Sequence, residues 1–192
     1  MAAFRPIANT RSMTGMPTGR LAVWWLIASE IVIFGGLLAS YIMHRIAHPE
    51  WASFASHTNT WAGAFNTFVL LTSSLSAVLG HKAAEEGNGK KAAQYLWMTM
   101  GGAALFICVK AAEWTHEIHE GYTITANAFW AFYYTAAGLH ALHVIAGAII
   151  MGFVARDAYH NRELHRVELI GIYWHFVDIV WIFLFPLLYI AK

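Results

Sequence analysis

The stretch that decides the fold is Tyr173-Trp174-His175-Phe176-Val177-Asp178-Ile179-Val180-Trp181, near the end of a chain of 192 residues. The run stays apolar to Tyr189, so the segment at about 168–190 is long enough to cross a bilayer, which takes about 20 helical residues. His175 and Asp178 interrupt it, and a spacing of three places both side chains on one helical face, within reach of a hydrogen bond. Ionisable groups are unfavourable in hydrocarbon and normally face protein, where they have partners. The stretch therefore predicts a membrane helix that packs against other helices.

The composition is that of a membrane protein. Hydrophobic residues make up 58% of the chain and charged residues only 12%, whereas soluble domains carry about 25% charged residues. Five segments are long and apolar enough to span a membrane: about 20–43, 61–80, 94–114, 129–154 and 168–190. We therefore predict an all-α fold, a polytopic membrane bundle with five transmembrane helices, that forms a single domain over residues 20–192 after a polar tail at 1–19.

Basic residues orient this bundle. Nine of the twelve Lys and Arg residues lie in the tail and in the second and fourth loops. Because positively charged loops remain on the cytoplasmic side, we predict a cytoplasmic N-terminus and an external C-terminus. The third loop, with Glu117 and Glu120, is then expected to be an acidic external surface. Five tryptophans at span ends are expected to be interfacial anchors: Trp51, Trp61, Trp97, Trp114 and Trp130.

Ionisable residues from three spans lie at a similar predicted depth. They form the expected buried polar network: Glu30, His140, His143, His175 and Asp178. Such a network either fixes the bundle by hydrogen bonds or takes part in proton or lipid handling. Asn66 and Glu113 are secondary polar positions, the latter near the external end of the third span.

Small residues and loop histidines give two more predictions. Gly35, Gly36 and Ala39 in the first span allow another helix to approach closely, and we expect this face to pack against a neighbouring subunit. Thr72, Ser76 and Gly80 form a similar stripe in the second span. His160 and His165, in the fourth loop, are candidates for a cytoplasmic proton antenna, although loop histidines are usually just solvated.

Neither nucleic-acid binding nor metal binding is indicated. The net charge is +1 and no cluster of Lys or Arg suggests a nucleic-acid partner. The single cysteine, Cys108, excludes an intrachain disulfide. Glu113 and His116 form one Glu-x-x-His pair, but a di-iron bundle needs two such pairs and two more glutamates at one level. We therefore predict no metal site in this chain.

Together the polar segments resemble subunit III of the haem-copper oxidases, and most closely the short five-helix form of cytochrome c oxidase subunit III. The similar segments, in the order of that family, are ASEIVIFGG at 28–36, NTFVLLTSS at 66–74, Glu113, GLHALHVIAG at 138–147 and YWHFVDIVW at 173–181. The first resembles the family's helix with a buried glutamate that carbodiimides attack, here Glu30. The resemblance covers about residues 20–190.

The resemblance implies a non-redox accessory subunit of a proton-pumping terminal oxidase in the aerobic electron transport chain, which oxidises cytochrome c and reduces oxygen to water. It places the haems and copper in partner subunits I and II, and it implies that this chain contacts subunit I and supports its stability and proton uptake. It also implies a multi-pass protein of the bacterial inner membrane. Many members have two more N-terminal helices that form a phospholipid cleft. This chain resembles only the last five, so phospholipid is expected at a subunit interface instead.

Two alternatives stay open on the sequence. One is subunit III of a quinol oxidase or of a homologue linked to nitric oxide reductase. The other, of a different class, is a self-contained di-metal membrane oxidase, in which the mid-membrane carboxylates and histidines bind metal.

Overall fold

A computed structural model describes residues 17–191, and its regular elements are helices. They are α1 (Thr18–Ala47), α2 (Trp51–Ala55), α3 (Thr60–Glu85), α4 (Gly89–His119), α5 (Ala128–Tyr159), α6 (His165–Phe185) and the π-helical turn η2 (Pro186–Ile190). Five of the described helices are long and apolar enough to cross a membrane, with η2 extending the last. The predicted all-α fold with five spans is confirmed. Most of the tail predicted at 1–19 lies outside the described residues, and α1 already begins at Thr18.

Asparagine caps set the beginnings of three spans. The side-chain Oδ1 atoms of Asn59, Asn88 and Asn127 accept hydrogen bonds of 3.0–3.1 Å from the backbone N–H three residues later. Each cap satisfies one N–H that the first helical turn leaves free. Gly87 and Gly121, just beyond α3 and α4, have φ angles of 75° and 89°, which glycine adopts without strain. The helices therefore extend past the apolar segments into polar turns that the sequence prediction left as loops.

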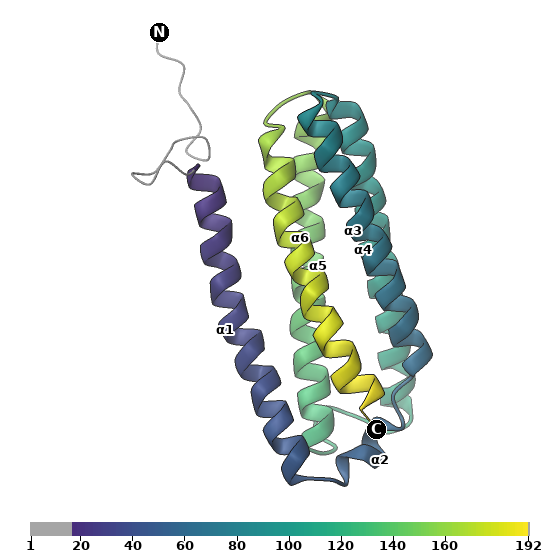
Figure 1. The fold of residues 1–192 in the computed structure, drawn as a ribbon. Coiled ribbons are helices and arrows are strands. Elements are labelled where there is room, and N and C mark those ends of the chain that lie inside the picture. The colour runs from purple at the N-terminus through teal and green to yellow at the C-terminus, as the bar shows by residue number, and fades with distance from the viewer. Residues whose placement is uncertain (1–16, 192) are drawn as a thin grey trace.

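Helices α3, α4, α5 and α6 form a four-helix bundle, and α1 lies beside it (Figure 1). Near the C-terminal end of α1, Tyr41 donates a 3.0 Å hydrogen bond to the carbonyl of Leu187, and Arg45 donates one of 2.9 Å to Ala191. At its other end, Arg20 lies 2.6 Å from the carboxylate of Glu168. These contacts attach α1 at both ends to the strongly buried last helix.

Tryptophans fill the core between α6 and its neighbours. Trp174 and Trp181 are 0% and 1% exposed, and their indole N–H groups donate to Ser73 and Thr67 on α3 at 3.1 and 3.0 Å. The expectation of interfacial anchors is wrong for Trp130, which is fully buried, and for Trp51, which is 4% exposed. These two rings pack against other aromatic side chains of the bundle rather than facing lipid.

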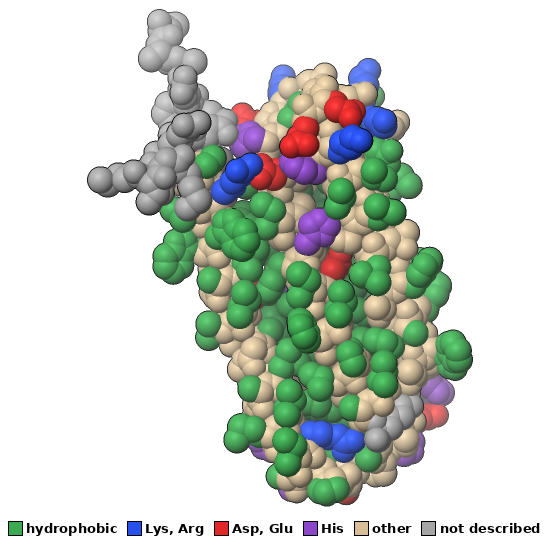
Figure 2. Space-filling view, in the orientation of Figure 1, with side chains coloured by type: hydrophobic (Ala, Val, Ile, Leu, Met, Phe, Trp, Pro, Cys, Tyr) green, Lys and Arg blue, Asp and Glu red, His purple; other side chains and the backbone are tan. Residues whose placement is uncertain are grey.

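Close contact between α3 and α4 depends on small residues, as the stripe in the second span predicts. A Cβ at Gly80 would lie 3.3 Å from that of Tyr95, and the hydroxyls of Ser76 and Thr99 lie 2.9 Å apart. Thr72, however, is exposed and bonds only within its own helix. Hydrophobic side chains cover the middle of the face in Figure 2, while most charged ones lie toward its two ends.

Candidate functional site

Glu30 of α1 meets His143 of α5. The carboxylate Oε2 lies 3.1 Å from His143 Nε2, and the two side chains are 12% and 18% exposed. His143 Nδ1 is 2.8 Å from the carbonyl of Leu139, so that nitrogen carries the hydrogen and donates it. Nε2 then directs a lone pair, and not a hydrogen, at the carboxylate, unless a second proton lies between Nε2 and Oε2. A hydrogen bond between Nε2 and Oε2 therefore requires a proton between these two atoms.

The pair lies in a groove of about 430 Å³ between α1 and the helices α5 and α6. Its walls are mostly apolar, and Arg166 lies among the lining residues. The expectation that Glu30 has a polar neighbour from span two, four or five is met. The small residues Gly35, Gly36 and Ala39 are exposed on α1, and a Cβ at either glycine would meet no atom within 4 Å. Packing of this face against a neighbouring subunit stays a prediction.

His175 and Asp178 are not joined to each other by a hydrogen bond, contrary to expectation. His175 Nδ1 lies 2.5 Å from the hydroxyl of Ser74 on α3. Asp178 is 3% exposed, and the side chain of Ser74 also acts on its carboxyl group, although neither carboxyl oxygen has a partner in ordinary hydrogen-bond geometry among the described residues. The spacing correctly predicted that both side chains face the bundle. Ser74 on the neighbouring helix α3, however, is a nearer partner for the imidazole of His175.

His140 lies in an aromatic site. It is fully buried, it stacks on Trp181 with ring centroids 5.1 Å apart, and it contacts the edge of Phe106 at 5.5 Å. Within the described chain neither ring nitrogen has a hydrogen-bond partner. The buried amide of Asn66 reaches the carbonyl of Phe106 at 3.5 Å, and its oxygen also lacks a partner there.

Within the described residues 17–191, the five predicted network residues therefore do not form one connected network. Glu30 and His143 form one pair, and His175 bonds to α3. His140 lies buried with no hydrogen-bond partner within residues 17–191, and Asp178 lies buried beside Ser74. The sequence correctly predicted that these five side chains are buried or partly buried. Their similar depth did not determine which side chains meet, because each helix can rotate independently of the others.

The loop histidines lie at the end of the bundle where α5 and α6 are connected. His160 is exposed and its Nδ1 lies 2.9 Å from the carbonyl of Arg156. It lines a cavity of about 480 Å³ with Arg156, Arg162 and other charged residues. His165 Nδ1 lies 3.5 Å from the carboxylate of Glu163. Their use as a proton antenna stays a prediction.

A second polar site lies at the opposite end and was largely missed by sequence reasoning. We call it the Lys110 cluster, and it consists of Lys110, Glu113, Glu117, Tyr133 and Tyr189. Lys110 is 1% exposed, and its ammonium donates to Glu113 at 3.1 Å, to Tyr133 at 3.2 Å and to Tyr189. All three of its N–H groups are used.

The remaining contacts of the cluster converge on the hydroxyl of Tyr133. That oxygen lies 3.0 Å from a carboxyl oxygen of Glu113, from one of Glu117 and from the hydroxyl of Tyr189. Four aromatic rings also surround the ammonium of Lys110, with centroids 5.0–5.7 Å away. The cluster joins α4, α5 and the C-terminal turn η2 through buried polar side chains.

This cluster corrects one expectation. Glu117 is not part of an acidic external loop, since α4 continues to His119 and Glu117 is 3% exposed. Lys110, near the outer end of the third span, is a buried member of the same polar site. Its spacing to Glu113 and Glu117, at positions i, i+3 and i+7, was the available signal for one shared helical face.

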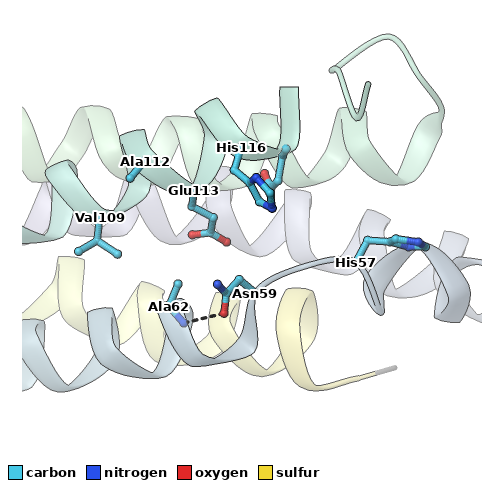
Figure 3. Close-up of a pocket in the computed structure, with 8 residues that line it drawn as sticks. His57, Asn59, Ala62, Val109, Ala112, Glu113 and His116 are labelled. Carbon is cyan, nitrogen blue, oxygen red and sulfur yellow. Dashed lines mark hydrogen bonds between the residues drawn. The ribbon is translucent and has the colours of Figure 1, made fainter. Parts of the chain in front are cut away.

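A cavity of about 350 Å³ adjoins the cluster (Figure 3). Its lining includes the buried Glu113 and Glu117 and, toward the surface, the exposed His57 and His116. Asn59 also lines it and caps α3 beside it (Figure 3). The cavity therefore connects the exposed end of the bundle with the buried carboxyl groups.

Among residues 17–191 there is no group of three or more histidine, cysteine, aspartate or glutamate side chains arranged to hold a metal ion. Several buried ionisable groups instead contact Lys, Tyr, Ser or His side chains. This arrangement can hold protons and join helices.

The family model described as cytochrome c oxidase subunit III matches residues 7–192. This chain belongs to that family. A cytochrome c oxidase subunit 3 from Thermostichus vulcanus is 32% identical over 169 residues, which are 85% of this chain and 83% of that protein. A probable cytochrome c oxidase subunit 3 from Nocardia farcinica is 32% identical over 173 residues, with 88% and 85% covered. The match to a heme-copper oxidase subunit I+III from Aeropyrum pernix is 29% identical and covers 90% of this chain and 22% of that protein.

These similarities establish a haem-copper oxidase subunit III, an accessory and multi-pass membrane subunit of a terminal oxidase complex. A self-contained di-metal oxidase and the quinol or nitric oxide branches are not favoured by them. Association with other oxidase subunits follows from membership.

Proposed function

We propose that this chain is a non-redox subunit of a proton-pumping cytochrome c oxidase, which binds subunit I directly and supports its stability and proton uptake. The observation that carries the proposal is the family match over residues 7–192. The relative from Aeropyrum pernix, named for subunits I and III together, supports a direct contact with subunit I. Subunit II and cytochrome c complete the proposed complex, with haem and copper in the partner subunits.

Charge distribution supports a cytoplasmic N-terminus and an external C-terminus. The start of α1 and the loops after α3 and α5 lie at one end of the bundle, and the C-terminus lies at the other (Figure 1). The first end carries the basic residues of the second and fourth loops, including Lys90 and Arg162. By the positive-inside rule this end faces the cytoplasm, in agreement with a bacterial inner membrane.

The exposed face of α1 is the proposed contact with subunit I. Large apolar side chains such as Trp25 and Val32 are 68% and 74% exposed there, and Gly35 and Gly36 leave room for a close helix. Small residues at a helix surface favour backbone approach in membranes. The apolar groove beside Glu30, between α1 and the helices α5 and α6, is suited to a phospholipid acyl chain.

Purification of the complex from its native membrane tests the proposal. We expect this chain to co-purify with haem-bearing subunits, to show the visible spectrum of a haem-copper oxidase, and to carry no iron or copper when expressed alone. Gly36→Leu should lower its content in the complex, whereas Ile46→Leu, also on the exposed surface of α1, should not. Stoichiometric iron or copper in the isolated chain would overturn the proposal.

A further inference from the structure

The Lys110 cluster contains more acceptors than hydrogens. The hydroxyl of Tyr133 has one hydrogen but lies 3.0 Å from a carboxyl oxygen of Glu113 and 3.0 Å from one of Glu117. Ionised carboxylates only accept, so one of these two contacts lacks a hydrogen unless a carboxyl group is protonated.

The formal charges also indicate that the cluster lacks a proton. One ammonium faces two carboxyl groups that are 7% and 3% exposed, at Glu113 and Glu117. With both ionised, the site would retain one negative charge in surroundings that hold several aromatic rings. An uncompensated buried charge is strongly unfavourable, and binding of a proton removes it.

Glu117 is the better position for the missing proton. The ammonium of Lys110 donates to Glu113, whereas Glu117 receives no charged donor. Tyr134 lies 3.4 Å from Glu117, but its hydroxyl is only 2.8 Å from the carbonyl of Tyr122, which therefore takes its hydrogen. A carboxylic acid at Glu117 would donate to the hydroxyl of Tyr133, which could then donate its own hydrogen to Glu113.

The adjoining cavity gives this proton a path to water. Its volume of about 350 Å³ is enough for several water molecules, since one occupies about 30 Å³ in the liquid. His57 from the loop before α3 and His116 from α4 line it, and Glu120 lies 3.3 Å from His116. The titratable groups around the carboxyl groups of Glu113 and Glu117 are these residues and the tyrosines of α5 and η2.

We propose that Glu117, with Glu113 and Lys110, forms a proton-binding site that exchanges one proton through the cavity at the C-terminal end of the bundle. This end is opposite the basic loops, so the site is separate from the Glu30–His143 pair and from the loop histidines. The inference does not depend on the electron donor of the oxidase.

Infrared difference spectroscopy of the purified oxidase complex tests the site. We expect one carboxylic acid C=O band that shifts in D₂O and is lost on titration to alkaline pH. Glu117→Gln should abolish this band. Glu86→Gln, at an exposed position at the opposite end of the bundle, should leave it unchanged and is the control.

Exchange kinetics test the cavity separately. Ala112 lines the cavity from the surface of α4, so Ala112→Phe should slow the D₂O shift while the band itself remains. An exchange rate equal to that of the unmodified complex would contradict the proposed path.

Three results would overturn the proton site: a band that persists in Glu117→Gln, no pH-sensitive carboxylic band in the unmodified complex, or a carboxylate band that responds to Na⁺ or K⁺ instead of pH. The last would mean that a metal cation balances the charge. If Glu117→Gln does not assemble, Glu117→Asp should shift the band frequency, and an unshifted band would also reject the assignment.

Discussion

Replacement of Lys110 by methionine removes the only ammonium from a buried cluster and keeps a side chain of similar length. Glu113 would lose its charged donor at 3.1 Å, and the hydroxyls of Tyr133 and Tyr189 would each lose a donor. The phenols can rotate their own hydrogens, so the stranded carboxylate dominates the effect. Breaking a buried ion pair by removing one partner destabilises a protein by about 3–5 kcal/mol. We expect Lys110→Met to lower the free energy of unfolding by about that amount.

A second substitution separates charge from shape. In Lys110→Met with Glu113→Gln, no uncompensated carboxylate remains at position 113. The double variant should recover about 1–3 kcal/mol relative to Lys110→Met alone, within the range of measured coupling energies for neighbouring residues. Lys91→Met, at an exposed position on the same helix, is the control and should change stability by less than about 0.5 kcal/mol.

The free energy of unfolding is measured on the chain in lipid bicelles, for example by steric trapping. Circular dichroism of each variant checks that the helices are retained before unfolding. Loss of less than about 1 kcal/mol in Lys110→Met would mean that the ion pair contributes no more than an exposed one. A double variant no more stable than Lys110→Met would refute the charge argument.

Four further substitutions test other contacts. Ser74→Ala should lower stability by about 1 kcal/mol because it removes the hydrogen bond to His175 and a polar neighbour of Asp178. Asp178→Leu should not lower the subunit content of the complex, because neither carboxyl oxygen has a partner in ordinary hydrogen-bond geometry within residues 17–191. Both are checked by thermal unfolding and by quantitative co-purification, and the reverse order of severity would contradict the assignment. Glu30→Gln should keep assembly and much of the oxygen consumption, and complete loss of oxygen reduction would argue for a direct chemical function. Gly63→Ala should destabilise the bundle by about 1–3 kcal/mol, because its Cβ would lie 2.8 Å from an aromatic ring of the last helix. A thermal midpoint equal to that of the unmodified chain would show that the ring can move aside.

Part of the site could be predicted because burial has a clear sequence signal. A charged or imidazole side chain inside an apolar span must face protein, and this rule placed Asp178 and His140 in the interior, as observed. The Lys110 cluster lacked that signal because its members lie near the ends of spans, where water and lipid headgroups would also accept them. A lysine at a span end is commonly exposed, so only the surrounding helices reveal that this one is buried.

The sequence by itself determined the five membrane helices, their approximate positions and the family. Twenty or so apolar residues must form a helix in hydrocarbon because their backbone groups have no other hydrogen-bond partners there. Tertiary structure decided which polar side chains meet, because helical periodicity defines a face but neither the rotation of a helix nor its neighbours. Glu30 therefore meets His143, His175 meets Ser74 instead of Asp178, and Lys110 reaches Tyr189 near the C-terminus. Each of these contacts joins residues far apart in the chain, and packing of the large aromatic side chains selects the helix rotations that allow them.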